Sequence, residues 1–235
     1  MSHRRYNSLL VLALAFLCTS CAHVQLSPLP ESSRIPLAVA TSDLTGTHSD
    51  SLFLNVLEST LQTDFIYSIK LGSTFGGDKA WCLTLAQNPF RQPKIGEEPL
   101  FNVLADLERA DFASVSSLRS DLLGYLFFGP FVGTVLSDQD EDTYAAALQY
   151  RFNFKEPVGS PQLLVRVARE GNVNQTSRRE LMMSSTTDAV NFFLMHLADR
   201  LCEQGKVRLQ RKRWDAHSER EVAEKLYQWL PPAKR

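Results

Sequence analysis

The sequence predicts an α+β domain, in which an antiparallel or mixed sheet carries helices packed mainly on one face. Three observations lead to this fold class. Apolar and polar residues alternate in the two halves of residues 143–169, which predicts a long β-hairpin there. Shorter runs typical of strands occur at residues 35–40 and 65–71. A strongly periodic helical pattern covers residues 187–205.

The first half of the domain is expected to form a strand, a helix, a second strand and a second helix. Residues 35–40 are a compact apolar run typical of a buried strand, and Ser49 or Asp50 can cap the helix that follows. Residues 65–71 alternate as in a half-buried strand. Pro99 suits the first turn of the second helix. The apolar face expected for this second helix comprises Leu100, Val103, Leu104 and Leu107.

The second half of the domain contains its clearest helix. Residues 178–184 are compatible with one more strand, and Thr187 with Asp188 then begins the helix. Gly205 ends the helix. The single α+β domain is expected to end at the same residue and to cover residues 35–205. The apolar face of this helix comprises Val190, Phe193, Leu194, Leu197, Ala198 and Leu201.

Residues 206–235 contain a basic run followed by a C-terminal amphipathic helix. The spacing of Ser218 and Glu221 matches a capping box, and Pro231 ends the helix. The basic run is typical of a solvated stretch, with contact to phosphates of lipid or glycan headgroups as the alternative. It comprises Arg208, Arg211, Lys212 and Arg213.

The N-terminal segment, residues 1–20, has the layout of a secretory signal peptide. A positively charged start precedes an apolar run of about a dozen residues, which is too short to span a bilayer. Thr19 and Ser20 are small residues placed directly before Cys21. We therefore expect residues 1–20 to be removed.

A cysteine directly after the expected cleavage site resembles the lipobox of bacterial lipoproteins. That resemblance implies that Cys21 receives diacylglycerol on its thiol and an acyl chain, such as palmitate, on its new amino group. Residues 21–34 then form a flexible lipidated tether. Ala22 is not Asp, the residue that retains lipoproteins in the inner membrane of well-studied Gram-negative bacteria, so the resemblance favours the outer membrane, facing the periplasm. An ordinary secretory signal and an uncleaved anchor are the alternatives.

Composition and charge fit a globular exported domain. The chain has 235 residues, of which 44% are hydrophobic and 22% charged, as in an ordinary folded protein. Without residues 1–20, which contain Arg4 and Arg5, 23 basic residues stand against 26 acidic ones, a formal net charge of −3. This balance does not favour nucleic acid, and no nucleic-acid partner is expected.

Two cysteines remain for the exported domain, because Cys18 leaves with the signal segment and Cys21 carries the lipid. In an oxidising envelope, Cys82 and Cys202 are expected to form a disulfide, which would stabilise the fold by about 4 kcal/mol on a chain-entropy estimate. Two separately buried thiols are the alternative.

Residues 122–136 form an uncharged internal stretch. As a helix it would reach about 22 Å, which is less than a hydrocarbon core of about 30 Å, so we do not expect it to span a membrane. It is expected to be either a core strand or buried loop, or an apolar surface that enters a lipid leaflet or docks on a partner. The candidate membrane or partner contacts are Leu122, Tyr125, Phe127, Phe128 and Phe131.

Downstream of Cys21 the chain shows no motif of a known catalytic or metal centre. The part of the chain after Cys21 lacks the G-x-S-x-G, H-E-x-x-H and C-x-x-C patterns. The acidic residues that begin at Asp138 have calcium-loop spacing, but Thr143 replaces the required glycine and Gln149 replaces the final glutamate. We expect no enzyme activity, no cofactor and no metal site.

The order of elements is similar to that of the periplasmic domains of assembly and transport lipoproteins, such as those that activate penicillin-binding proteins or export curli. The similarity covers residues 35–71 and 143–202. Residues 155–161 lack the Asp-x-x-Thr-Gly turn of these proteins, so no functional residue is carried over. We expect a non-catalytic accessory or assembly subunit of a cell-envelope machine, held at the membrane by its lipid and bound to an envelope protein. A carrier or sensor of a lipid or other apolar ligand is one alternative, and an envelope hydrolase is another.

Overall fold

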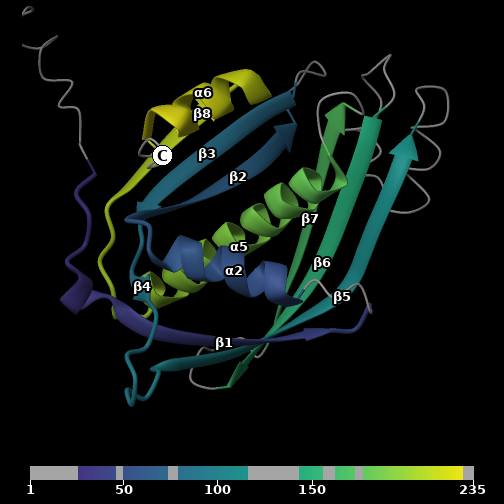
Figure 1. Cartoon of the computed structure of the whole chain (residues 1–235). Helices are drawn as coiled ribbons and strands as arrows, with labels where there is room; N and C mark the ends of the chain where they lie inside the picture. The colour runs from purple at the N-terminus through teal and green to yellow at the C-terminus, as the bar shows by residue number, and fades with distance from the viewer. Residues whose placement is uncertain are drawn as a thin grey trace, which may run out of the picture.

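The computed structural model describes residues 26–45, 50–73, 79–115, 143–155, 162–172 and 177–229. Within these residues the chain forms two β-sheets and three α-helices, preceded by the short 3-10 helix η1 (Glu31–Ser33). This architecture confirms the predicted α+β class. Figure 1 shows the helices lying between and against the two sheets.

The larger sheet has five strands in the order β4-β1-β5-β6-β7. Strand β1 (Ile35–Asp43) runs parallel to β4 (Phe90–Arg91) on one side and to β5 (Phe101–Val115) on the other. Strands β6 (Thr143–Lys155) and β7 (Gln162–Asn172) follow in antiparallel order. The sheet is therefore mixed, and β6 and β7 are the two arms of the long predicted hairpin.

The smaller sheet is antiparallel and joins β2 (Phe65–Ser73), β3 (Lys79–Gln87) and β8 (Arg211–Ala216), with β3 in the middle. The first of these strands contains the run predicted over residues 65–71. Strand β8 contains most of the basic run, for which the sequence pattern predicts no strand. The sequence predicts one sheet, whereas the structure has two.

Helix α5 (Arg178–Glu203) lies between the two sheets (Figure 1). It packs on β6 and β7 of the larger sheet and also contacts β2 of the smaller one. Helix α2 (Asp50–Leu61) lies against α5 and β1. Helix α6 (Glu219–Trp229) contacts β3 and β8. None of the helices in the described part of the chain is long and apolar enough to cross a membrane.

The core of the fold is centred on aromatic side chains of β6 and the two helices beside it. Phe152 and Phe193 stack with their ring centroids 4.2 Å apart, and Phe53 of α2 lies 5.0 Å from Tyr150. Polar residues alternate with the aromatic ones along β6 and lie on the face of the sheet away from the core. On that face Arg151 forms an ion pair with Glu108 of β5. The alternation predicted for this strand is confirmed.

The helix predicted to start at Pro99 is wrong, because this segment forms β5. Leu100, Val103, Leu104 and Leu107 fit a helical spacing, but the side chains that the structure buries have a period of two. They are Phe101, Val103, Ala105 and Leu107. Pairing with β1 and β6 on its two sides satisfies the backbone of this strand, and tertiary context thereby overrides the local pattern.

Helix α5 begins about one-third of its length earlier than predicted, so the strand expected at residues 178–184 is wrong. Ser177 caps the helix: its side chain accepts from the backbone N–H of Glu180 at 3.3 Å, while its own N–H donates to the Glu180 carboxylate at 2.7 Å. The predicted end is confirmed. Gly205 has a φ of 68°, and its N–H donates to the Cys202 carbonyl at 3.0 Å.

Candidate functional site

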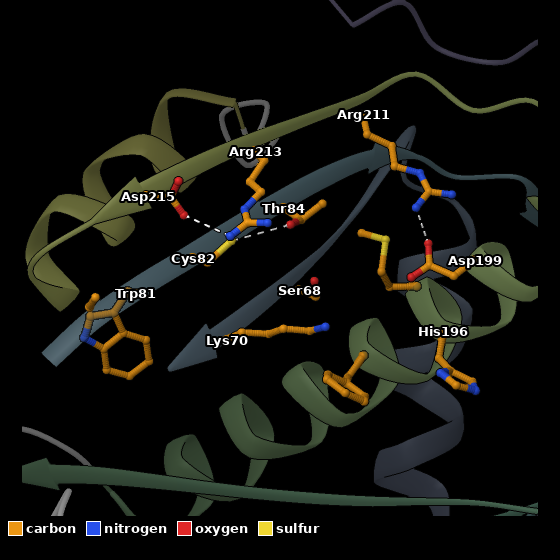
Figure 2. Close-up of a pocket in the computed structure, with 13 residues that line it drawn as sticks. Ser68, Lys70, Trp81, Cys82, Thr84, His196, Asp199, Arg211, Arg213 and Asp215 are labelled. Carbon is orange, nitrogen blue, oxygen red and sulfur yellow. Dashed lines mark hydrogen bonds and ion pairs between the residues drawn. The ribbon is translucent and has the colours of Figure 1, made fainter. Parts of the chain in front are cut away.

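A cleft of about 620 Å³ lies between the smaller sheet and helix α5. Figure 2 shows side chains of three strands facing one side of that helix. The lining residues are Ser68 and Lys70 of β2; Ala80, Trp81, Cys82 and Thr84 of β3; Arg211, Arg213 and Asp215 of β8; and Phe192, Met195, His196 and Asp199 of α5.

Strand register explains why polar residues gather on this face of the sheet. Lys70, Cys82 and Asp215 are direct cross-strand partners, and so are Ser68, Thr84 and Arg213 in the neighbouring row. Residues in register on adjacent strands point to the same face of a sheet. The sequence alternation of β2, β3 and β8 therefore builds two polar rows side by side.

The opposite face of the smaller sheet is apolar and is covered by α6. Leu83 and Ala216 pack there against Val222 of the helix, and all three side chains are buried. The predicted cap of this helix is confirmed, because the N–H of Glu221 donates to the Ser218 hydroxyl at 3.2 Å. Covering one face in this way leaves the polar face to α5 and the cleft.

Helical spacing explains the other wall of the cleft. Phe192, Met195, His196 and Asp199 are separated by three, one and three residues, which places them on one side of α5. Phe193 lies on the side that packs into the core, and Met195 and Phe192, at the boundary, also contact the core cluster. This wall is partly apolar and partly polar, because Phe192 and Met195 are followed along the helix by His196 and Asp199.

Two ion pairs neutralise most of the charge around the cleft. Arg211 of β8 binds Asp199 of α5 and so connects the sheet to the helix. Arg213 binds Asp215 along the same strand at 3.2 Å, and this hydrogen bond is the main cause that raises the pKa of the Arg213 guanidinium. Figure 2 marks both pairs. Each arginine of the cleft therefore has an acidic partner.

Lys70 is the charged lining residue that makes no ion pair among the residues that the structure describes. His196 is half-buried, and the pKa of its imidazole is lowered from 6.5, chiefly by burial and next by the charge of Arg200. It is therefore neutral at pH 7. Among the described residues, the cleft thus presents one positive charge without an ion-pair partner.

The sequence pattern alone does not predict this site. The basic run is divided by its strand: Arg211 and Arg213 face the cleft, whereas the ammonium of Lys212 lies 5.1 Å from the ring centroid of Trp214. Charged and apolar residues alternate only from Arg213 to Ala216, a short strand signal that could have indicated the faces of this segment. In the described residues no three His, Cys, Asp or Glu side chains come together as a metal site.

The two cysteines expected to form a disulfide lie on different elements. Cys82 is on β3 beside the cleft, with its sulfur 3.9 Å from the Thr84 hydroxyl, and Cys202 is near the end of α5. Both are half-buried free thiols in this structure. A bridge would need their Cα atoms within about 7 Å of each other. The pairing stays a prediction.

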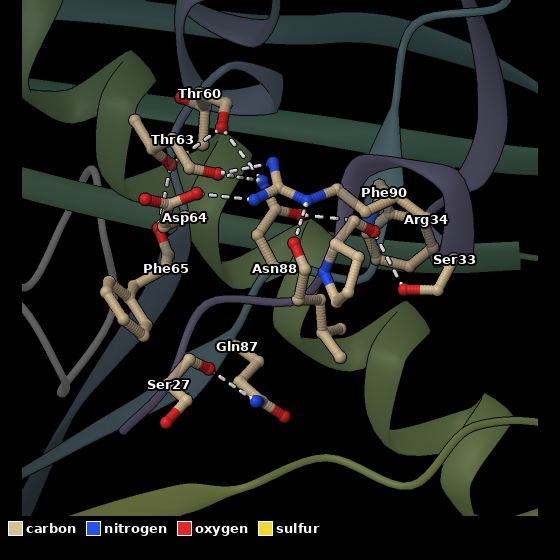
Figure 3. Close-up of polar contacts among 12 residues, drawn as sticks. Ser27, Ser33, Arg34, Thr60, Thr63, Asp64, Phe65, Gln87, Asn88 and Phe90 are labelled. Atoms are coloured by element: carbon tan, nitrogen blue, oxygen red, sulfur yellow. Dashed lines mark hydrogen bonds and ion pairs between the residues drawn. The ribbon is translucent and has the colours of Figure 1, made fainter. Parts of the chain in front are cut away.

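The chain that leads to the domain is attached beside the smaller sheet. Leu26 is only 4% exposed. The N–H of Ser27 donates to the Gln210 side chain at 3.1 Å, and the Ser27 carbonyl accepts from the Gln87 side chain at 2.5 Å (Figure 3). The second part of the expected tether, residues 26–34, therefore lies on the domain.

Buried polar side chains fix the end of this attached segment. The guanidinium of Arg34 donates to the Thr63 carbonyl at 3.1 Å and binds Asp64 at 2.5 Å (Figure 3). Asn88, which is fully buried, donates to the carbonyls of Thr60 and Thr63, both at 3.0 Å. These contacts tie the N-terminal segment, the end of α2 and the end of β3 together.

Several sequence predictions fall outside the described residues. Cys21 is among them, as are Leu122, Tyr125, Phe127, Phe128 and Phe131 of the uncharged stretch. Comparison of the sequence with models of protein families finds no match, and comparison with curated proteins finds none either.

Proposed function

We propose that this chain is a membrane-tethered lipoprotein of the bacterial cell envelope, which acts as a non-catalytic accessory or assembly subunit. The observation that carries the proposal is the position of Cys21, directly behind a signal-like segment and only five residues before the buried Leu26. Lipid on Cys21 anchors the domain to the membrane, and the absence of Asp after it favours the outer membrane, facing the periplasm.

The attachment of Ser27 to the domain gives the tether a short reach. Ser27 follows Cys21 by six positions, and an extended chain of that length spans about 20 Å. The domain is therefore held close to the headgroups and cannot extend far into the envelope. This geometry suits a subunit that meets its partner at the membrane surface.

The free edge of β7 is a suitable contact for an envelope protein. Within the described residues β7 pairs with β6 alone, and no described strand lies on its other edge. Leu164 on this strand is 44% exposed. A partner could add a strand here, because an exposed sheet edge supplies backbone hydrogen bonds and alternate side chains supply specificity.

Membrane fractionation tests the anchor. In a bacterial host, the wild-type chain should sediment with membranes, and Cys21→Ser should release it to the soluble fraction or leave it unprocessed. Cys18→Ser is the matched control, because it changes a cysteine three residues away in the segment expected to be removed. Equal behaviour of Cys21→Ser and wild type would reject the proposal.

Site-specific crosslinking tests the partner contact. A photoreactive residue at Leu164 should give one envelope adduct, and the same residue at the exposed Gln228 of α6 should not. The adduct should disappear when Cys21→Ser removes the chain from the membrane. Identical adducts from both positions would contradict a specific contact at the β7 edge.

A further inference from the structure

We propose that the cleft between the smaller sheet and α5 binds an amphiphile with one anionic headgroup, the headgroup at Lys70 and the apolar part on Phe192 and Met195. This goes beyond the role of a tethered accessory subunit. It gives the domain a ligand of its own, and it does not depend on the lipid at Cys21.

The charge of the ligand follows from the ion pairs of the cleft. Arg211 and Arg213 are engaged by Asp199 and Asp215, so these four groups leave no net charge. Lys70 remains as an exposed cation without an ion pair in the described structure. One carboxylate or phosphate would complete the cleft, because opposite charge at a partly enclosed site is favourable.

Two polar groups near Lys70 can hold the same headgroup. The Ser68 hydroxyl lies one row away on β2, and the Ser68 residue is only 6% exposed. No hydrogen bond of this hydroxyl is present among the described contacts, so it can donate to an anion. His196 lies on the facing wall, and as a neutral imidazole it can donate as well.

The apolar part of the ligand follows from the rest of the lining. Phe192 and Met195 form part of the helix wall, and Ala80 contributes from β3. Trp81 borders the cleft, but it pairs with Ala216 and packs against the cluster beneath α6. A polar wall joined to an apolar one matches a molecule with a charged end and a hydrocarbon body. The cavity of about 620 Å³ is within the usual range of small-molecule sites.

The position of the cleft indicates where such a ligand comes from. Arg211, which lines the cleft, directly follows Gln210, the residue that binds Ser27 of the attached segment. The cleft is thus beside the chain that runs back to Cys21. In the tethered protein it lies close to a bilayer, which is a source of fatty acids and anionic lipids.

Photolabelling of the full chain in its membrane tests this inference. The probe is a fatty acid that carries a diazirine in its chain, and labelled peptides are identified by mass spectrometry. We expect label on peptides of β3 and α5 that line the cleft. Loss of one charged hydrogen bond in Lys70→Gln should lower the labelling about tenfold. Lys70→Arg should retain it, and the matched control Lys212→Gln, on the other face of the sheet, should be unchanged.

Further arms separate the outcomes. Competition by dodecanoate or by dodecyl phosphate distinguishes a free fatty acid from a phosphate-bearing lipid. A diazirine-labelled fatty alcohol should label weakly. Equal labelling of folded Lys70→Gln and wild type, equal labelling by the alcohol, or label confined to other elements would each overturn the proposal. Purified Cys21→Ser protein that is given the same probe in solution should be labelled on the same peptides and with the same dependence on Lys70, so failure of the lipid anchor and failure of the cleft give different results.

Discussion

Substitution of Asn88 by alanine should destabilise the domain by about 3 kcal/mol. The fully buried side chain makes three hydrogen bonds: it donates to the carbonyls of Thr60 and Thr63, both at 3.0 Å, and accepts from the N–H of Phe90 at 3.1 Å. Each such bond contributes about 1 kcal/mol net, and its loss leaves a buried backbone group unsatisfied. For a chain of this size the melting temperature should fall by about 6–12 °C.

Urea unfolding followed by circular dichroism measures this loss, because the change in midpoint at constant slope gives the change in stability. Asn55→Ala is the matched control. Asn55 is exposed on α2, where alanine is the better helix former, so its replacement should be neutral or slightly stabilising. A loss below about 0.5 kcal/mol for Asn88→Ala would refute the inference that Asn88 joins α2 to the β3–β4 connection.

Other parts of the fold give predictions of the same kind. Phe193→Ala should cost about 4 kcal/mol, because Phe193 is fully buried and stacks on Phe152; calorimetry that shows an unchanged melting temperature would contradict this packing. Ser177→Ala should cost about 1 kcal/mol through loss of the α5 cap, measurable by urea unfolding, with Ser177→Asp as the variant that retains stability. Hydrogen bonds from Arg91 hold the pKa of Glu97 down to about 2, below its ordinary value of 4.5. The ionised carboxylate therefore stabilises the fold fully at pH values above 4.5, and this stabilisation is lost as the pH falls from 4.5 through about 2. Glu97→Gln should therefore lower stability at pH 7 and have a much smaller effect at pH 2, where the carboxylate is about half protonated; a pH-independent difference would argue against the pair.

Local patterns predict the parts of the fold whose faces are strictly divided between core and solvent. The hairpin of β6 and β7 has this property, since Tyr150 and Phe152 are buried and Arg151 between them is not. Strand β5 also buries alternate side chains, but apolar residues, Leu104 and Leu100 just before the strand, lie on its other face. Together with Val103 and Leu107 they give this strand a helical period by coincidence. Only its pairing with β1 and β6 decides its conformation, and that pairing joins residues far apart in the chain.

The cleft could not be predicted from single segments, because its walls come from four elements. Lys70 and His196 are 126 residues apart in the chain, and neither belongs to a motif. The basic run suggests a surface, and its register with β3 shows that Arg211 and Arg213 turn toward α5. The ion pair of Arg211 with Asp199 is likewise a product of the tertiary fold.

The most direct test of Cys21 lipidation is the mass of the N-terminal peptide of protein purified from bacterial membranes. We expect a peptide that begins at Cys21 and carries diacylglycerol on its sulfur and a third acyl chain on its amino group. A peptide that begins at Met1, or that contains Cys21 with an unmodified thiol, would show that the chain is not a lipoprotein.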